Sequence, residues 1–218
     1  RTTSEPDQDK SFRGSRDGFV ETMVFNAALI RRRIRSPRLC VEHLEVGETS
    51  RTDVAVCYFE GRADPELVNT VRERIAQARV DALTMNQESL AELLVRKRWY
   101  NPFPKFKFTE RPDAAAAQIL EGDVVVLVDN SPAAIILPTT LFDVMEEAND
   151  YYFPPIPGSS LRLVRFFTTF LTTFLTPGWL LLIQEPERVP GWLEFILMEE
   201  PAQVPPLLQL LILELAID

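Results

Sequence analysis

The sequence contains few of the side chains on which catalytic and metal sites depend. His43 is the one histidine, and the two cysteines, Cys40 and Cys57, do not form a CxxC pair. No glycine-rich phosphate loop, GxSxG elbow or HExxH motif occurs. A metal site or an activated nucleophile needs several such groups close together. We therefore expect a protein that is not an enzyme and has no cofactor, with both cysteines packed as structural thiols.

Basic residues are also scarce relative to acidic ones. The chain has 23 Lys and Arg against 32 Asp and Glu, a net charge of −9 at pH 7. Binding to the phosphates of nucleic acid needs a basic surface, so nucleic acid is not an expected partner. The composition changes along the chain. Residues 161–218 hold 3 basic and 7 acidic residues among many Leu, Phe and Pro, whereas residues 1–160 are long enough to bury a core.

Residues 17–150 show the periodicities of a small α/β domain. Apolar residues recur at helical spacing between Asp17, expected as the N-cap, and Arg35. The run DVAVCYFE is apolar on both faces, as in a strand covered on both sides. The predicted fold is α/β, a small mixed sheet with packed helices. Its helices are expected at 17–35, 64–78, 88–98, 112–120 and 139–148, and its strands at 39–46, 52–60, 123–128 and 133–137.

Three segments are expected to lack regular structure. Residues 1–16 are polar without periodicity, so they are expected to be a linker. We expect the chain to begin inside a longer reading frame, with the linker coming from an upstream subdomain. Residues 99–107 contain two prolines and several aromatic residues, so they are predicted to form an irregular loop. Residues 151–160 are predicted to be a second linker.

An uncharged run of 18 residues, from Phe166 to Ile183, follows the α/β domain. As a helix it spans about 27 Å, close to the thickness of a hydrocarbon core, so we predict a first transmembrane helix over residues 161–184. Arg162 and Arg165 precede the run and Glu185 follows it, which places the N-terminal domain in the cytoplasm. The alternative is a helix buried in a protein core.

Threonines form a stripe along this helix. Thr168, Thr172 and Thr176 recur at i, i+4 spacing, with Thr169 and Thr173 beside them, and Pro177 is expected to kink the helix. The hydroxyls either bond to their own helix and to a neighbouring helix or line a water-filled path, so the face with Pro177 is predicted to be in contact with a helix or a pore.

The last part of the chain is predicted to return to the membrane. Residues 185–204 are expected to form an extracytoplasmic loop with a short interfacial helix at 192–198. Residues 205–218 are apolar but too short to cross, and we expect the start of a truncated second membrane helix, with a re-entrant or interfacial end as the alternative. Glu214 would then lie within the bilayer, where a carboxylate is costly and usually functional.

The densest positive charge is the run IRRRIR, which contains Arg31, Arg32, Arg33 and Arg35. Cations suit the C-terminal turn of a helix. We interpret this run as an electrostatic contact with carboxylates of the same assembly. Binding of a phosphate or an anionic lipid headgroup is the alternative.

Several ordered motifs together resemble the germinant-receptor A-subunit family of spore germination proteins. The resemblance runs from about residue 1 to the end of the chain. Its first motif contains Arg13, Gly14, Arg16, Gly18 and Phe19, followed by Asn26. The later motifs are Glu110, Arg111, Pro112 and Asp113, then Leu120 to Gly122, and then Val128 and Asp129 with Pro132.

The resemblance implies a membrane protein of the spore inner membrane with a cytoplasmic domain, acting in ion release during germination. It also implies homo-oligomers and further germination membrane proteins as partners, and it identifies no ligand for the domain. The chain lacks the family's first cytoplasmic subdomain and later membrane helices, so we expect a fragment. The alternative function is a membrane-tethered cytoplasmic module that binds partner proteins without transport.

Overall fold

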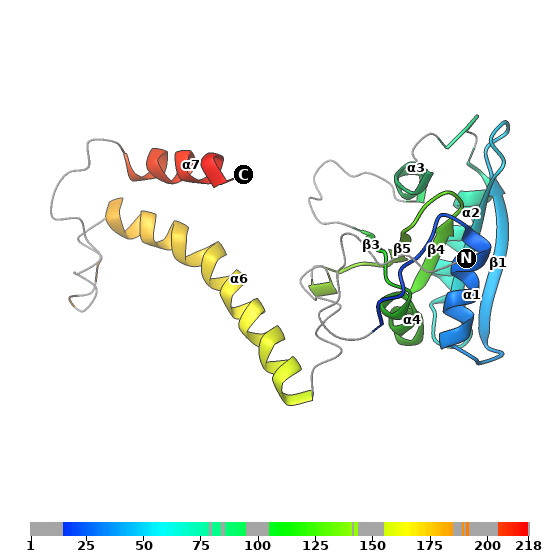
Figure 1. Cartoon of the computed structure of the whole chain (residues 1–218). Coiled ribbons are helices and arrows are strands. Elements are labelled where there is room, and N and C mark those ends of the chain that lie inside the picture. Colours follow the sequence, from blue (N-terminus) through cyan, green and yellow to red (C-terminus); the bar gives the residue numbers. More distant parts are fainter. Residues whose placement is uncertain are drawn as a thin grey trace. The chain divides into compact units, whose positions relative to one another are not determined.

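The computed structural model describes residues 15–78, 80–83, 86–94, 105–140, 142–143, 155–184, 189, 191 and 205–217. The chain divides into two compact units, Arg1–Pro154 and Pro155–Asp218. The first is an α/β unit and the second is helical (Figure 1). The predicted α/β fold with helices packed on a sheet is confirmed.

The α/β unit is built on a five-stranded sheet in the order β1-β2-β4-β5-β3. A mixed sheet was predicted, but all four strand pairs are antiparallel. The strands predicted at 123–128 and 133–137 form a hairpin, since β4 pairs with β5 in antiparallel register. The strands are β1 (Leu39–Val46), β2 (Thr52–Phe59), β3 (Lys107–Thr109), β4 (Val124–Val128) and β5 (Ala134–Leu137).

Helices cover both faces of the sheet (Figure 1). Alternate residues of a strand point to opposite faces, so Val125 and Leu127 of β4 join the core with α1 and α4, and Val124 and Val126 join the core with α2 and α3. All five residues of β4 are buried, which explains its uninterrupted apolar sequence. The helices of this unit are α1 (Met23–Arg33), α2 (Pro65–Ala76), α3 (Asn86–Leu94) and α4 (Pro112–Glu121).

Helix α1 begins later than predicted, and Asp17 is not its N-cap. The helix starts at Met23, whose backbone N–H donates to Asp129 Oδ1 at 2.9 Å. The preceding residues run in a non-helical path, because the Phe19 N–H donates to the Glu110 carbonyl at 2.8 Å. Long-range hydrogen bonds therefore override the apolar periodicity that extended the prediction to residue 17.

The ends of α2 and α4 follow local rules that the sequence shows. Asp64 Oδ1 accepts from the Glu66 N–H at 2.9 Å at the start of α2, with proline at the first helical position. Gly122 ends α4 with φ of 118°, and an added Cβ there would lie 2.9 Å from the Arg62 carbonyl oxygen. Only glycine adopts this conformation at that distance without strain.

The structure changes three other predictions in this unit. Strand β3 was not predicted, and its first residue lies at the end of the expected 99–107 loop. Helix α3 begins at Asn86 rather than Glu88, and residues 95–98 lie outside the described residues. Of the helix predicted at 139–148, Phe142 and Asp143 are helical and residues 144–148 lie outside the described part.

The second unit contains α6 (Pro155–Gln184) and α7 (Pro206–Ile217). Helix α6 has 30 residues and is therefore about 45 Å long. It starts at Pro155, so residues 155–160 are helical rather than a linker. Prolines are tolerated in the first helical turn because the N–H groups there have no partner within the helix. Among the described residues, α6 is the one helix long and apolar enough to cross a membrane, over Ile156–Ile183 with mean hydropathy 1.6.

Candidate functional site

The threonine face of α6 is mostly exposed, and part of it is bonded to its own helix. The Thr169 hydroxyl donates to the Arg165 carbonyl at 3.0 Å. The hydroxyls of Thr172 and Thr173 both donate to the Thr169 carbonyl, at 3.0 and 2.8 Å. Thr168 is exposed and Thr176 is half-buried. Back-bonding of this kind satisfies hydroxyls without a partner helix or water.

Pro177 lies inside α6. Because proline has no N–H, the carbonyl one turn earlier, that of Thr173, loses its helical donor. The Thr173 carbonyl, on the threonine stripe, therefore receives no hydrogen bond from residue 177.

The structure describes only part of the chain that follows α6. Residues 185–188 and 192–204, with the expected loop and interfacial helix, lie outside the described residues. Glu214 lies within helix α7. Its place in a bilayer and the truncated second membrane helix stay predictions.

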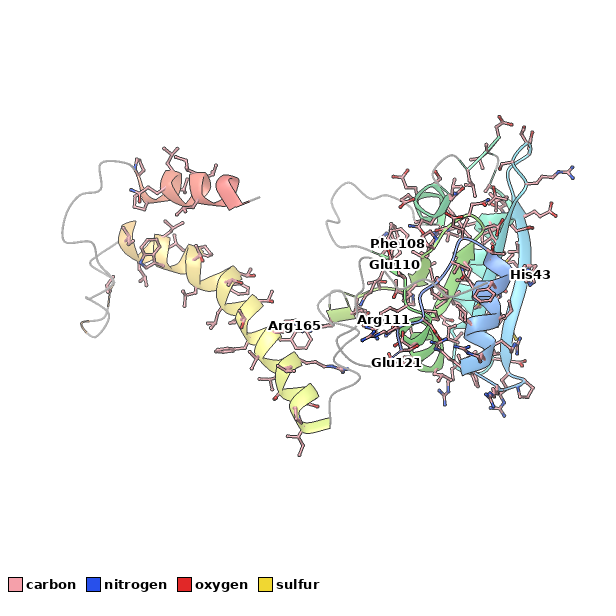
Figure 2. All side chains as sticks on the ribbon, viewed as in Figure 1. His43, Phe108, Glu110, Arg111, Glu121 and Arg165 are labelled. Atoms are coloured by element: carbon pink, nitrogen blue, oxygen red, sulfur yellow. The ribbon has the colours of Figure 1, made fainter. Side chains whose placement is uncertain are left out.

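The two main motifs found in the sequence meet in the α/β unit; Figure 2 labels Glu110 and Arg111 of the second. The Phe19 N–H donates to the Glu110 carbonyl at 2.8 Å, and the Phe19 ring is buried in the core with α1 and α4. Asn26, only 1% exposed, accepts from the Val20 N–H at 2.8 Å and donates to the Val20 carbonyl. These bonds hold the segment before α1 in place. Gly18 is buried and Arg16 is exposed, whereas Arg13 and Gly14 lie outside the described residues.

Arg111 is a buried arginine at the start of α4. It is 1% exposed, and its guanidinium donates to Asp113 through Nε at 3.2 Å and Nη2 at 2.8 Å. Thr109 Oγ1 accepts from the Arg111 backbone N–H at 3.2 Å. Pro112 occupies the first helical position. The motif therefore stabilises the strand-to-helix junction by a forked ion pair, which only arginine can make.

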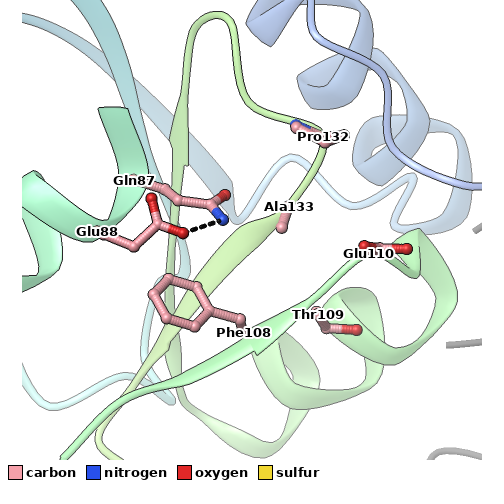
Figure 3. A pocket seen from close by; sticks show the side chains of 7 residues that line it. All are labelled: Gln87, Glu88, Phe108, Thr109, Glu110, Pro132 and Ala133. Atoms are coloured by element: carbon pink, nitrogen blue, oxygen red, sulfur yellow. Dashed lines mark hydrogen bonds between the residues drawn. The ribbon is translucent and has the colours of Figure 1, made fainter. Parts of the chain in front are cut away.

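A pocket of about 320 Å³ lies beside this junction, lined by Gln87, Glu88, Phe108, Thr109, Glu110, Pro132 and Ala133. Figure 3 shows the Phe108 ring close to Gln87 and Glu88, whose side chains are joined by a hydrogen bond of 3.1 Å. The lining brings α3, β3 and the β4–β5 turn together, which no local pattern reveals. Among the residues that line it there is no histidine or cysteine.

The four predicted arginines have different surroundings. Arg32 and Arg33 both make an ion pair with Asp17, and Arg33 also donates to Ser15 Oγ at 2.9 Å. Arg31 and Arg35 are exposed and donate to backbone carbonyls at 3.4 and 3.3 Å. Asp17 is therefore a partner of the last turn of α1 instead of a cap at its first.

A polar network that the sequence did not predict joins β1, β2 and α2. Arg72 donates to both carboxylate oxygens of Glu42, at 2.9 and 2.7 Å, and the Tyr58 hydroxyl donates to Glu42 at 2.6 Å. The bonds from Arg72 lower the pKa of Glu42, and the bond to Glu42 raises the pKa of Tyr58. The network fixes α2 on the sheet.

Two other groups have perturbed acidity. Burial raises the pKa of Asp123 to about 7, with smaller contributions from the negative charges of Asp143 and Glu121. Burial raises the pKa of the Cys57 thiol to about 12, as expected of a packed structural cysteine.

Neither group belongs to a catalytic arrangement within the described residues. His43 is exposed on β1 (Figure 2). No group of three or more His, Cys, Asp or Glu that could hold a metal occurs in the described part of the chain.

Comparison with known proteins agrees with the motifs. The family model of the Bacillus/Clostridium GerA spore germination protein matches residues 1–218. Stage V sporulation protein AF of Bacillus subtilis is 48% identical over 196 residues, which cover 90% of this chain and 40% of that protein. Spore germination protein KA of the same species is 32% identical over 172 residues, which cover 79% of this chain and 31% of that protein.

A solved structure is also similar. The N-terminal domain of the A subunit of the Bacillus megaterium spore germinant receptor GerK3 is 32% identical, with a TM-score of 0.45, over 57% of this chain and 97% of that domain. These two relatives are a sporulation protein and a germination protein by name. The chain spans less than half the length of these two curated relatives. It belongs to the GerA family of Bacillus/Clostridium spore germination proteins.

Proposed function

We propose that this chain is the membrane-proximal part of a subunit of a spore inner-membrane germination complex that assists ion release. The observation that carries the proposal is the order of the parts. A family α/β unit with a covered sheet is followed by α6, a helix of 30 residues with an uncharged run of membrane-spanning length. In this arrangement the α/β unit lies in the cytoplasm, on the side of Arg162 and Arg165.

Oligomerisation gives the polar face of α6 a role. A single helix in lipid does not form a conducting path, because a polar stripe needs other helices to enclose water. Several copies, or this chain with other germination membrane proteins, would place Thr168, Thr172 and Thr176 around a shared axis. The Thr173 carbonyl, which receives no hydrogen bond from Pro177, would add an acceptor to that axis.

The alternative function is a cytoplasmic interaction module tethered by one helix, without transport. The bonds of Thr172 and Thr173 to the Thr169 carbonyl favour it, since hydroxyls satisfied within their own helix need no water.

Ion flux in liposomes separates the two functions. The complete protein that contains this chain is reconstituted, and the variant T172L/T176L is compared with T169L/T173L, which removes the same groups from the neighbouring angle of the helix. We expect the first variant to lower flux about tenfold or more and the second to have a smaller effect. Equal flux in wild type and T172L/T176L would exclude the pore-lining role and favour the tethered module.

A further inference from the structure

One end of the α/β unit carries a concentration of exposed arginines. Arg31 and Arg32 lie in the last turn of α1, and Arg35 and Arg38 lie in the turn that leads into β1; all four are exposed. The turn is compact, because Ser36 accepts from Arg31 at 3.4 Å and from the Leu39 N–H at 3.2 Å. These four residues are called the arginine surface below.

Within the part of the chain that the structure describes, few carboxylates neutralise this surface. Asp17 pairs with Arg32 and with the half-buried Arg33, and Glu60 is joined to Arg38 through the backbone, N–H to carbonyl, at 2.9 Å. The carboxylates at the start of α2 lie on the other face of the sheet, because α1 and α2 belong to different core clusters. The arginine surface is therefore locally positive on a chain whose net charge is −9.

The contacts among the described residues leave most of this charge uncompensated. The guanidinium groups of Arg31 and Arg35 are held by neutral carbonyls at 3.4 and 3.3 Å, long distances for charge-assisted bonds. Arg38 has no side-chain hydrogen bond or ion pair among the described residues, and its own backbone faces the turn. Exposed guanidinium groups with such weak partners are suited to bind phosphate oxygens.

We propose that the arginine surface docks on anionic lipid headgroups of the membrane in which α6 is anchored. The inference rests on the proposed membrane placement of α6, which brings the surface close to a bilayer. The 11 residues between Asp143 and Pro155 can span at most about 40 Å. That reach is comparable to the diameter of a domain of this size, about 35–40 Å, so the tether allows this end of the unit to touch the headgroups.

Tethering also lowers the affinity that docking requires. An intramolecular contact forms at a high effective concentration, so a surface too weak to recruit a soluble domain suffices here. Each arginine near an anionic membrane changes the equilibrium by about fivefold. Docking would hold the α/β unit in one orientation against the bilayer, with the β1–β2 turn on the side away from it.

The test uses the whole chain in liposomes and a dye on Cys40. This cysteine is partly exposed at the start of β1, close to the arginine surface, whereas Cys57 is buried. Lipids with a quencher on the headgroup report the distance of the dye from the bilayer. We expect stronger quenching in phosphatidylglycerol vesicles than in phosphatidylcholine vesicles, and loss of the difference at about 1 M salt, where the Debye length falls to about 3 Å.

Variants identify the surface. R31Q/R35Q/R38Q leaves the ion pairs with Asp17 intact and should lower the docking equilibrium about 100-fold, at about fivefold for each arginine. The single substitution R38Q has R51Q as its matched control, because the two remove the same charge at opposite ends of the β1–β2 hairpin. Only R38Q should reduce quenching.

Each other outcome overturns the proposal. Equal quenching in both vesicles excludes anionic lipid as the ligand. Quenching that rises with protein density at fixed lipid assigns the surface to a second copy of the chain. Failure of the chain to insert at all, seen as its loss from floated vesicles, refutes the membrane placement instead and is thereby distinguished from a failure of docking.

Discussion

Arg111 gives the sharpest test of how the α/β unit is held together. Its guanidinium is 1% exposed and makes two hydrogen bonds to Asp113, whose side chain is 15% exposed. We consider R111M, which keeps much of the side-chain volume and removes the charge and all its donors. The substitution removes the guanidinium that forms the ion pair with the Asp113 carboxylate at the strand-to-helix junction.

The expected loss of stability follows from that burial. Removing one partner of a buried ion pair costs about 3–5 kcal/mol, mostly because the other charge remains without compensation. Asp113 retains some contact with water, so we expect the lower end, about 3 kcal/mol. The double variant R111M/D113L leaves no charge behind, and its loss should be smaller than the sum of the two single losses.

Hydrogen exchange of the β4 amides in detergent-solubilised chain measures the free energy of unfolding for this unit alone. A loss of about 3 kcal/mol corresponds to exchange more than about 100-fold faster under conditions where global opening dominates. R16M is the matched control, because Arg16 belongs to the same family motifs but is exposed. Exchange in R111M within about threefold of wild type would refute the assigned role of the pair.

Three further predictions concern single positions. G122A should destabilise the unit by about 1–2 kcal/mol in urea unfolding, since left-handed backbone costs a Cβ-bearing residue about 1 kcal/mol or more and the added Cβ would press on the Arg62 carbonyl. In the native chain a thiol reagent should modify Cys40 and leave Cys57 unreacted until denaturant is added, because Cys57 is buried and its pKa is raised to about 12. The raised pKa of Asp123, about 7, means that the folded state binds an extra proton between about pH 4 and 7. The free energy of unfolding should therefore fall as pH rises through that window, and D123N should remove this part of the pH dependence.

The outcomes that contradict these predictions are equally specific. Wild-type stability for G122A would mean that the turn tolerates a side chain. Two thiols titrated at once in the native chain would place Cys57 at the surface. A pH profile for D123N that matches wild type would show that Asp123 is hydrated in the folded state.

Local chemistry determined most of what could be predicted from the sequence. The apolar run of β4 and the turn that follows it, Asp64 before Pro65, and Gly122 at the end of α4 each carry a signal within a few residues. These features position the hairpin and the helices correctly. The uncharged run in α6 is equally local, because its length alone is informative.

The errors came from contacts between distant residues. Met23 is bonded to Asp129, and Phe19 to Glu110, so α1 starts where long-range partners place it. Strand β3 is three residues long and exists through its pairing with β5, which leaves no periodicity to detect. The Glu42–Arg72 pair joins residues 30 positions apart, and a charge pattern alone does not identify such partners.

The hydrogen bonds that fix the segment before α1 have a mechanical consequence. Phe19 is attached to the strand-to-helix junction through its main chain, and Glu21 accepts from the Asn130 N–H at 2.7 Å in the β4–β5 turn. Tension applied to the chain before Asp17 is thus transmitted directly to the sheet, because hydrogen bonds hold the segment between them. Force applied from that direction would act on β4 and β5 together, and the α/β unit would respond as one rigid body.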